Sequence, residues 1–84
     1  MKKNNNISEL KKVRKNIDNI DNEIIKLIAD RFKEIHKVTK LKDNQDQIID
    51  HERITHILKS VQSKAKKNKI DPEIITRIWQ IFIQ

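Results

Sequence analysis

Three cations lie among apolar residues in the first half of this sequence. Arg14, Arg31 and Lys42 belong to a segment whose apolar residues recur at alternating three- and four-residue steps. On a helical wheel with about 100° per residue, Arg31 and Lys42 fall in the middle of the apolar stripe and Arg14 falls at its edge. A cation in an apolar seam is costly unless an anion neutralises it. Because most acidic residues of the segment occupy polar positions, we expect a ligand to supply the anions.

The choice of arginine is informative because the chain holds fifteen lysines and only four arginines. A guanidinium group binds a carboxylate through two parallel hydrogen bonds, whereas lysine suffices for a solvated face. A simpler interpretation exists for each arginine. Arg31 alone more often pairs with a protein acid or extends to solvent, Arg53 has Asp50 and Glu52 as neighbours, and Arg77 is interpreted as structural. Together the cations favour recognition of carboxylates.

The spacing of these cations bears on how many chains form the site. Arg31 and Lys42 are about 16 Å apart along a helix axis, a gap that long side chains partly close. Arg14 and Arg31 are about 25 Å apart, too far for one metabolite-sized anion. If both bind carboxylates, they serve different sites. An antiparallel dimer, in which the Arg14 end of one helix meets the Arg31 region of its partner, gives two equivalent shared sites.

The elements that carry these residues are predicted to be three α-helices, so the fold class is all-α. Ser8 is a candidate N-cap, and neither glycine nor proline interrupts the chain from there to Lys42. Asp71-Pro72-Glu73 is a strong helix start, and the Asn in 66–69 is expected to accept the left-handed turn that ends the second helix. The predicted organisation is a disordered tail at 1–7 and one domain at 8–84, with helices at about 8–42, 50–67 and 72–84.

Composition restricts the function classes. The chain has 84 residues, a formal net charge of +7, no glycine and no cysteine. These absences exclude a glycine-rich phosphate loop, a disulfide and a thiolate nucleophile. A domain this small encloses a deep pocket only with difficulty, so oligomerisation is expected if it binds a small molecule. No apolar run reaches the length of a membrane span, and the polar start lacks a signal peptide, which predicts a soluble, cytoplasmic protein with no membrane partner.

The motifs resemble those of the AroQ-type, all-helical chorismate mutases. The resemblance covers residues 8–84 and is carried by Val13-Arg14-x-x-Ile17-Asp18-x-Ile20-Asp21-x-x-Ile24-Ile25-x-Leu27-Ile28-x-x-Arg31, then by Val38-x-x-x-Lys42, Asp50-x-x-Arg53 and Ile70-Asp71-Pro72-Glu73. It implies an intertwined three-helix homodimer with shared sites. The implied reaction is the rearrangement of chorismate, a small dianion, to prephenate in aromatic amino-acid biosynthesis, part of the shikimate pathway. This reaction requires no cofactor and no metal.

The resemblance also implies roles for individual residues. Arg14 of one protomer and Arg31 of the other are expected to clamp the two substrate carboxylates, with Arg53 assisting. Lys42 is expected to donate to the breaking ether oxygen, and Asp50 to hold the ring hydroxyl.

Two features depart from the family pattern. Ile54 stands where these mutases usually carry a glutamate for the substrate hydroxyl, and an apolar residue there resembles the related isochorismate-pyruvate lyases, which form salicylate. Asp50 fits the mutases better. The family's third helix continues beyond the position of Gln84 to a group that contacts the ether oxygen, so low activity is expected.

Alternatives therefore stay open. They are an isochorismate-pyruvate lyase, another mutase of a chorismate derivative, a regulatory mutase-like domain, and a basic helical module that binds nucleic acid or a partner helix. The last predicts lysines on one face, whereas lysines are spread over the first and second predicted helices and the three aromatic residues occupy apolar positions. A nucleic-acid partner is not expected.

Overall fold

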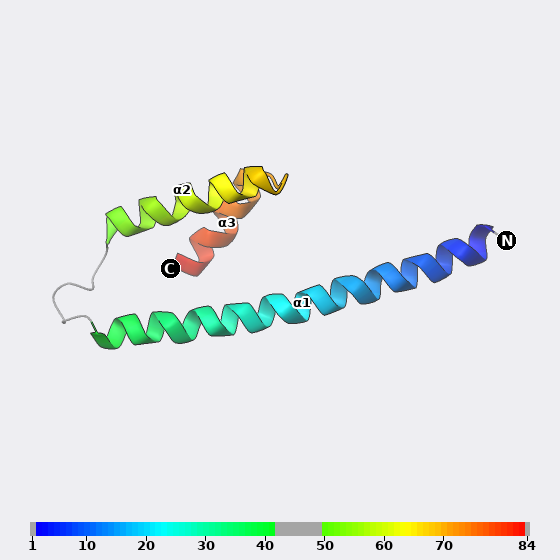
Figure 1. Cartoon of the computed structure of the whole chain (residues 1–84), viewed down its shortest axis with the longest axis horizontal. Helices are drawn as coiled ribbons and strands as arrows, with labels where there is room; N and C mark the ends of the chain where they lie inside the picture. The colour runs from blue at the N-terminus through cyan, green and yellow to red at the C-terminus, as the bar shows by residue number, and fades with distance from the viewer. Residues whose placement is uncertain (1, 42–49, 84) are drawn as a thin grey trace. The chain divides into compact units, whose positions relative to one another are not determined.

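The structure is a computed structural model that describes residues 2–41 and 50–83, with side chains from Asn6 onward. It contains three α-helices, α1 (Lys2–Leu41), α2 (His51–Lys67) and α3 (Pro72–Ile83), and no strand occurs in these ranges (Figure 1). The predicted all-α class and the long first helix are confirmed. By its contacts the chain divides into two compact units, Met1–Asp43 and Asn44–Gln84, and each is described by itself.

The first unit is the single helix α1, which begins at Lys2. The sequence predicts a start at Ser8 after a disordered tail at 1–7, so the observed helix begins earlier. The reason is local: residues 2–7 contain no proline or glycine, and polar residues alone do not end a helix.

The apolar stripe of α1 is open to solvent. From Asn6 to Leu41 every side chain is exposed except those of Ile28 and Arg31, which are half-buried. Leu10, Ile17 and Ile24 each keep close to half of their surface accessible, at 47%, 49% and 46%. A helix with this pattern requires a partner for its apolar face.

The second unit is a hairpin of α2 and α3, which pack against each other. Both helices start at an aspartate, as predicted. Asp50 Oδ1 accepts from the Arg53 backbone N–H at 3.0 Å, and Asp71 Oδ1 accepts from the Glu73 backbone N–H at 2.9 Å. These bonds satisfy amide groups that have no partner within the first helical turn.

The turn between α2 and α3 is a Schellman motif with a lysine in the left-handed position. The Ile70 N–H donates to Ala65 O at 2.8 Å, and the Lys69 N–H donates to Lys66 O at 3.1 Å. Lys69 has φ 60°, whereas Asn68 has φ −99°. The sequence-based assignment of the left-handed turn to Asn68 is therefore wrong by one residue.

Packing within the hairpin is thin. Ala65 is the one buried hydrophobic residue among those described. Both helices also carry half-buried side chains, and on α3 they include the edge-to-face pair Trp79 and Phe82, whose ring centroids are 5.2 Å apart. Other apolar residues of α3 stay exposed, as Ile74 does at 54% and Ile81 at 74%. In this hairpin α3 therefore keeps a second apolar face that is exposed.

Candidate active site

The start of α2 brings three of the predicted site residues together. Asp50, Arg53 and Ile54 lie within one helical turn. Asp50 O accepts from the Ile54 backbone N–H at 3.0 Å, while Oδ1 caps the helix. The Asp50 side chain is exposed, and within the described ranges Oδ2 makes no hydrogen bond. One carboxylate oxygen therefore holds the helix start while the other is available to a hydroxyl donor.

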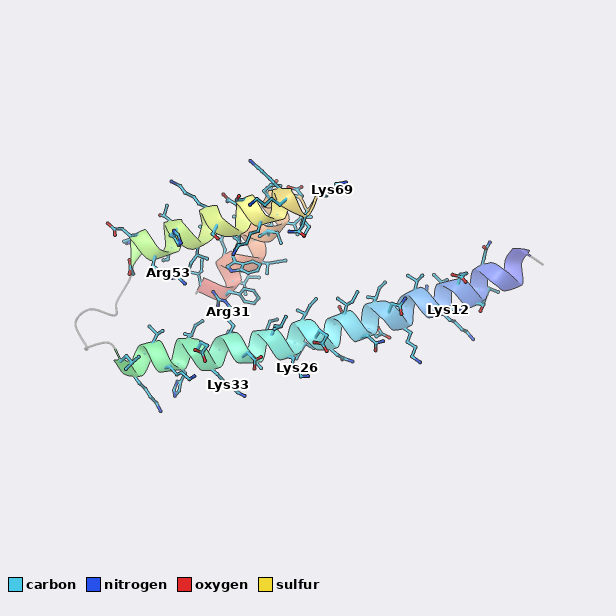
Figure 2. All side chains as sticks on the ribbon, in the orientation of Figure 1. Lys12, Lys26, Arg31, Lys33, Arg53 and Lys69 are labelled. Carbon is cyan, nitrogen blue, oxygen red and sulfur yellow. The ribbon has the colours of Figure 1, made fainter. Side chains whose placement is uncertain are left out.

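Arg53 lies in the first turn of α2, three positions after Asp50. The bond between Arg53 and Asp50 comes from the backbone N–H and not from the guanidinium group. Neither Asp50 nor Glu52 forms an ion pair with this arginine in the described part of the chain. The side chain is exposed (labelled in Figure 2). Arg77, in contrast, forms a surface ion pair with Glu73 at 3.4 Å.

The other two arginines lie on α1. Arg14 is exposed and Arg31 is half-buried, one turn after the half-buried Ile28. In Figure 2, Arg31 extends from the side of α1 opposite to Lys26 and Lys33. The two arginines are seventeen positions apart, or about 25 Å along the helix axis. Within α1 they belong to separate regions, as the spacing predicts.

Glu34, one turn after Arg31 in α1, forms an ion pair with Lys37. Glu34 Oε2 accepts from Lys37 Nζ at 2.8 Å. This hydrogen bond, reinforced by the negative charge of Glu34, raises the pKa of Lys37 above its usual value.

The predicted site is therefore divided between the two units. Lys42 lies outside the described residues. Arg14 and Arg31 belong to the first unit, and Asp50, Arg53 and Ile54 belong to the second.

A shallow depression on α2 was not predicted from the sequence. It has a volume of about 410 Å³ and is lined by His51, Glu52, Thr55, His56 and Lys59. None of the predicted site residues lines it. The depression lies between side chains on successive turns of α2. No sequence pattern predicts such a surface depression.

Neither a membrane-spanning helix nor a cluster of metal ligands occurs in the described residues. Across 2–41 and 50–83, no helix is long and apolar enough to cross a bilayer. Within the same ranges, no three histidine, aspartate or glutamate side chains lie close enough together to hold a metal ion.

The structure defines a small all-helical protein that carries arginines on each of its three helices. Comparison with known families makes this specific. Residues 13–84 match the family described as "Chorismate mutase type II", and the chain belongs to that family of isomerases. The match runs through both structural units.

Individual relatives agree with the family. The chain is 37% identical over 79 residues to a chorismate mutase of Methanocaldococcus jannaschii, covering 93% of this chain and 80% of that protein. It is 35% identical over 79 residues to a bifunctional chorismate mutase/prephenate dehydratase of Buchnera aphidicola from Schizaphis graminum, covering 92% of this chain but 20% of the relative. A second Buchnera aphidicola bifunctional protein is 35% identical over 72 residues, covering 84% and 19%. No solved structure matches the chain significantly.

Proposed function

We propose that this chorismate mutase works as a homodimer over residues 8–84, with each active site shared between protomers. Arg14 of one protomer and Arg31 of the other bind the two carboxylates of chorismate. Lys42, Asp50 and Arg53 complete the site on the Arg31 side. The observation that carries this proposal is the half-buried Arg31 in the apolar stripe of α1, with exposed Arg14 about 25 Å away along the same helix.

The open surface of α1 supports the dimer. Leu10, Ile17 and Ile24 are exposed to nearly half of their surface, and burying such a stripe is the main favourable term in helix association. An antiparallel pairing of two α1 helices covers both stripes at once. It also brings the Arg14 region of each helix to the Arg31 region of the other, which one chain alone cannot do.

The reaction is a unimolecular [3,3] rearrangement. The ether C–O bond of chorismate breaks while a C–C bond forms to give prephenate, so no nucleophile is consumed. The arginines hold the enolpyruvyl carboxylate and the ring carboxylate in the reactive conformer. Lys42 donates to the ether oxygen as negative charge develops there, which stabilises the transition state more than the substrate. Asp50 Oδ2 accepts from the ring hydroxyl.

The shared site is tested by mixing inactive variants. Arg14→Ala and Arg31→Ala homodimers are expected to lose chorismate turnover. If each is unfolded and the two are refolded together in equal amounts, half of the dimers are mixed and each mixed dimer has one intact site, so about one quarter of wild-type activity returns. The matched control is the double variant Arg14→Ala/Arg31→Ala mixed with Arg14→Ala, which supplies no Arg14 and stays inactive. No recovery in the first mixture contradicts the shared site.

Ile54 favours a second candidate, isochorismate-pyruvate lyase activity. This residue is half-buried on α2, one position after Arg53, and presents no hydrogen-bonding group to a substrate hydroxyl. Purified protein is incubated separately with chorismate and isochorismate, and products are identified by chromatography. Prephenate from chorismate supports the mutase proposal, and salicylate from isochorismate supports the lyase. Ile54→Glu is expected to raise mutase turnover. If the protein turns over neither substrate, a regulatory mutase-like domain is the remaining interpretation.

Cytoplasmic location and a role in aromatic amino-acid biosynthesis are part of the same proposal. The location is the expectation of the sequence analysis, and the biosynthetic role comes with the family. The two bifunctional relatives support the second, because in each the mutase is named together with a prephenate dehydratase, an activity that uses the product of the first reaction.

A further inference from the structure

The lysines of α1 lie on one face of the helix. With Leu10 taken as zero, the apolar stripe is centred at about 320°, and all lysines between Asn6 and Leu41 fall between about 100° and 200°. This face, called the lysine face below, is formed by Lys11, Lys12, Lys15, Lys26, Lys33, Lys37 and Lys40. Figure 2 shows Lys26 and Lys33 on the same side of α1 and Arg31 on the other. Lysines occur in α1 and α2, and within α1 they are segregated on one face.

Acidic residues lie at the borders of the lysine face. On the same wheel they fall below about 80° or above about 200°, so the centre of the lysine face is free of negative charge. They are Glu9, Asp18, Asp21, Glu23, Asp30 and Glu34. Of the seven lysines of this face, Lys37 is the one that forms an ion pair with a described residue, Glu34. A compositional bias towards lysine explains how many lysines there are, but it does not explain why they share one face.

The dimensions and charge of the lysine face fit a long, regular polyanion. Lys11 and Lys40 are twenty-nine positions apart, which is about 44 Å along the helix axis. A nucleic-acid duplex carries one negative charge per about 1.7 Å of its axis, so this length corresponds to about 13 base pairs. All seven lysines are exposed. They can therefore neutralise phosphates of the duplex and release the counterions condensed on it.

We propose that the lysine face binds the phosphate backbone of double-stranded nucleic acid without reading its sequence. Lysine is a point charge suited to phosphate, and α1 presents no arginine on this face for bidentate contacts with guanine. A duplex is favoured over a single strand because the face has no aromatic residue on which bases stack. Phe32, the aromatic residue of α1, falls outside it at about 40°.

The proposed dimer argues against a membrane as the partner. A helix that lies in a membrane inserts its apolar stripe. In the proposed dimer the partner helix covers the apolar stripe of α1, and the lysine face is the face left exposed. Arg14 and Arg31 lie outside the lysine face. Variants that abolish mutase activity are therefore expected to differ from variants that abolish duplex binding, and each proposal is tested separately.

The test measures binding of the full chain to a fluorescein-labelled DNA duplex of about 20 mixed-sequence base pairs by anisotropy, in KCl between about 50 and 200 mM. The variant Lys26→Gln/Lys33→Gln/Lys40→Gln removes three charges from the lysine face. The control Lys59→Gln/Lys66→Gln/Lys67→Gln removes the same charge from exposed positions of α2. Glutamine and lysine have similar helix propensities, and circular dichroism verifies that helix content is retained.

The wild type is expected to bind with a dissociation constant tighter than about 100 µM at about 100 mM KCl. If each lysine neutralises one phosphate, the lysine-face variant reduces the slope of log K against log [KCl] by about 2.7 and the affinity by on the order of 10²-fold. The control is expected to stay within about threefold of wild type. Equal losses in both variants, no duplex binding, stronger binding to a single strand, or binding only to phosphatidylserine vesicles each overturn the proposal.

Discussion

The Gln62 side-chain amide donates to Thr76 Oγ1 at 2.8 Å and joins α2 to α3. Thr76 Oγ1 in turn donates to Pro72 O at 2.8 Å, so the hydroxyl is used as both acceptor and donor. Both side chains are half-buried. In a hairpin with so little buried apolar surface, this polar contact helps to fix the position of α3 along α2.

Thr76→Val is expected to destabilise the hairpin by about 1–3 kcal/mol, because it leaves the Gln62 amide half-buried without its acceptor. Gln62→Leu/Thr76→Val removes both partners and is expected to cost less than the sum of the single changes. Urea unfolding followed by circular dichroism measures all three variants. Strictly additive costs would show that the two side chains do not interact.

Lys69→Gly is expected to stabilise the protein by about 1 kcal/mol. Lys69 has φ 60°, a conformation that costs a residue with a Cβ atom more than it costs glycine. Asn68→Gly is the matched control, since Asn68 has φ −99° and gains nothing from glycine. Thermal unfolding monitored by circular dichroism compares the two. A gain at position 68 equal to that at 69 contradicts the assignment.

Comparing variants at Asp50 and Asp71 distinguishes a capping role from a role in the proposed site. Each caps a helix, so Asp50→Ala and Asp71→Ala are both expected to lose about 1 kcal/mol of stability. Only Asp50 belongs to the proposed site, so only Asp50→Ala is expected to lower kcat/KM for chorismate under conditions where both variants are folded. Asp50→Asn keeps an N-cap oxygen, and we expect it to restore stability without restoring full turnover. Equal kinetic losses at 50 and 71 would remove Asp50 from the site.

Arg31→Lys is expected to lower kcat/KM by roughly 10²-fold or more, since an ammonium group cannot form the two parallel bonds of a guanidinium to a carboxylate. Helix propensity is almost unchanged, so helix content is expected to persist. Arg77→Lys, at an exposed pair with Glu73, serves as the control with wild-type kinetics. Steady-state chorismate consumption gives both values, and near-wild-type kinetics for Arg31→Lys would exclude a bidentate contact.

The fold was predictable where local signals act. Asp50, Asp71 and Pro72 mark helix starts because capping depends on residues adjacent in sequence. The start of α1 at Lys2 was missed because its polar residues contain neither a stop nor a cap. The left-handed residue was placed at Asn68 instead of Lys69, since propensity favours asparagine, whereas the register of the last turn decides the position. The Asn68 side chain instead donates to Lys64 O at 2.8 Å.

The candidate site was predictable only in part. Residues on one turn, such as Asp50 and Arg53, follow from helix periodicity. The hydrogen bond between Gln62 and Thr76 joins positions fourteen residues apart and depends on how two helices pack, which periodicity does not specify. The simpler interpretation of Arg53, an ion pair with Asp50 or Glu52, is not seen among the described residues, where the backbone N–H of Arg53 bonds to Asp50 Oδ1 instead.

Little apolar surface is buried within one chain. Ala65 is the one buried hydrophobic residue among those described, and the apolar stripe of α1 is exposed. In the proposed dimer most apolar burial occurs between chains, so folding and association form one equilibrium governed by mass action. Dilution then acts like a denaturant, and the unfolding midpoint rises with protomer concentration. Stabilities of variants of this protein are therefore comparable only at equal protein concentration.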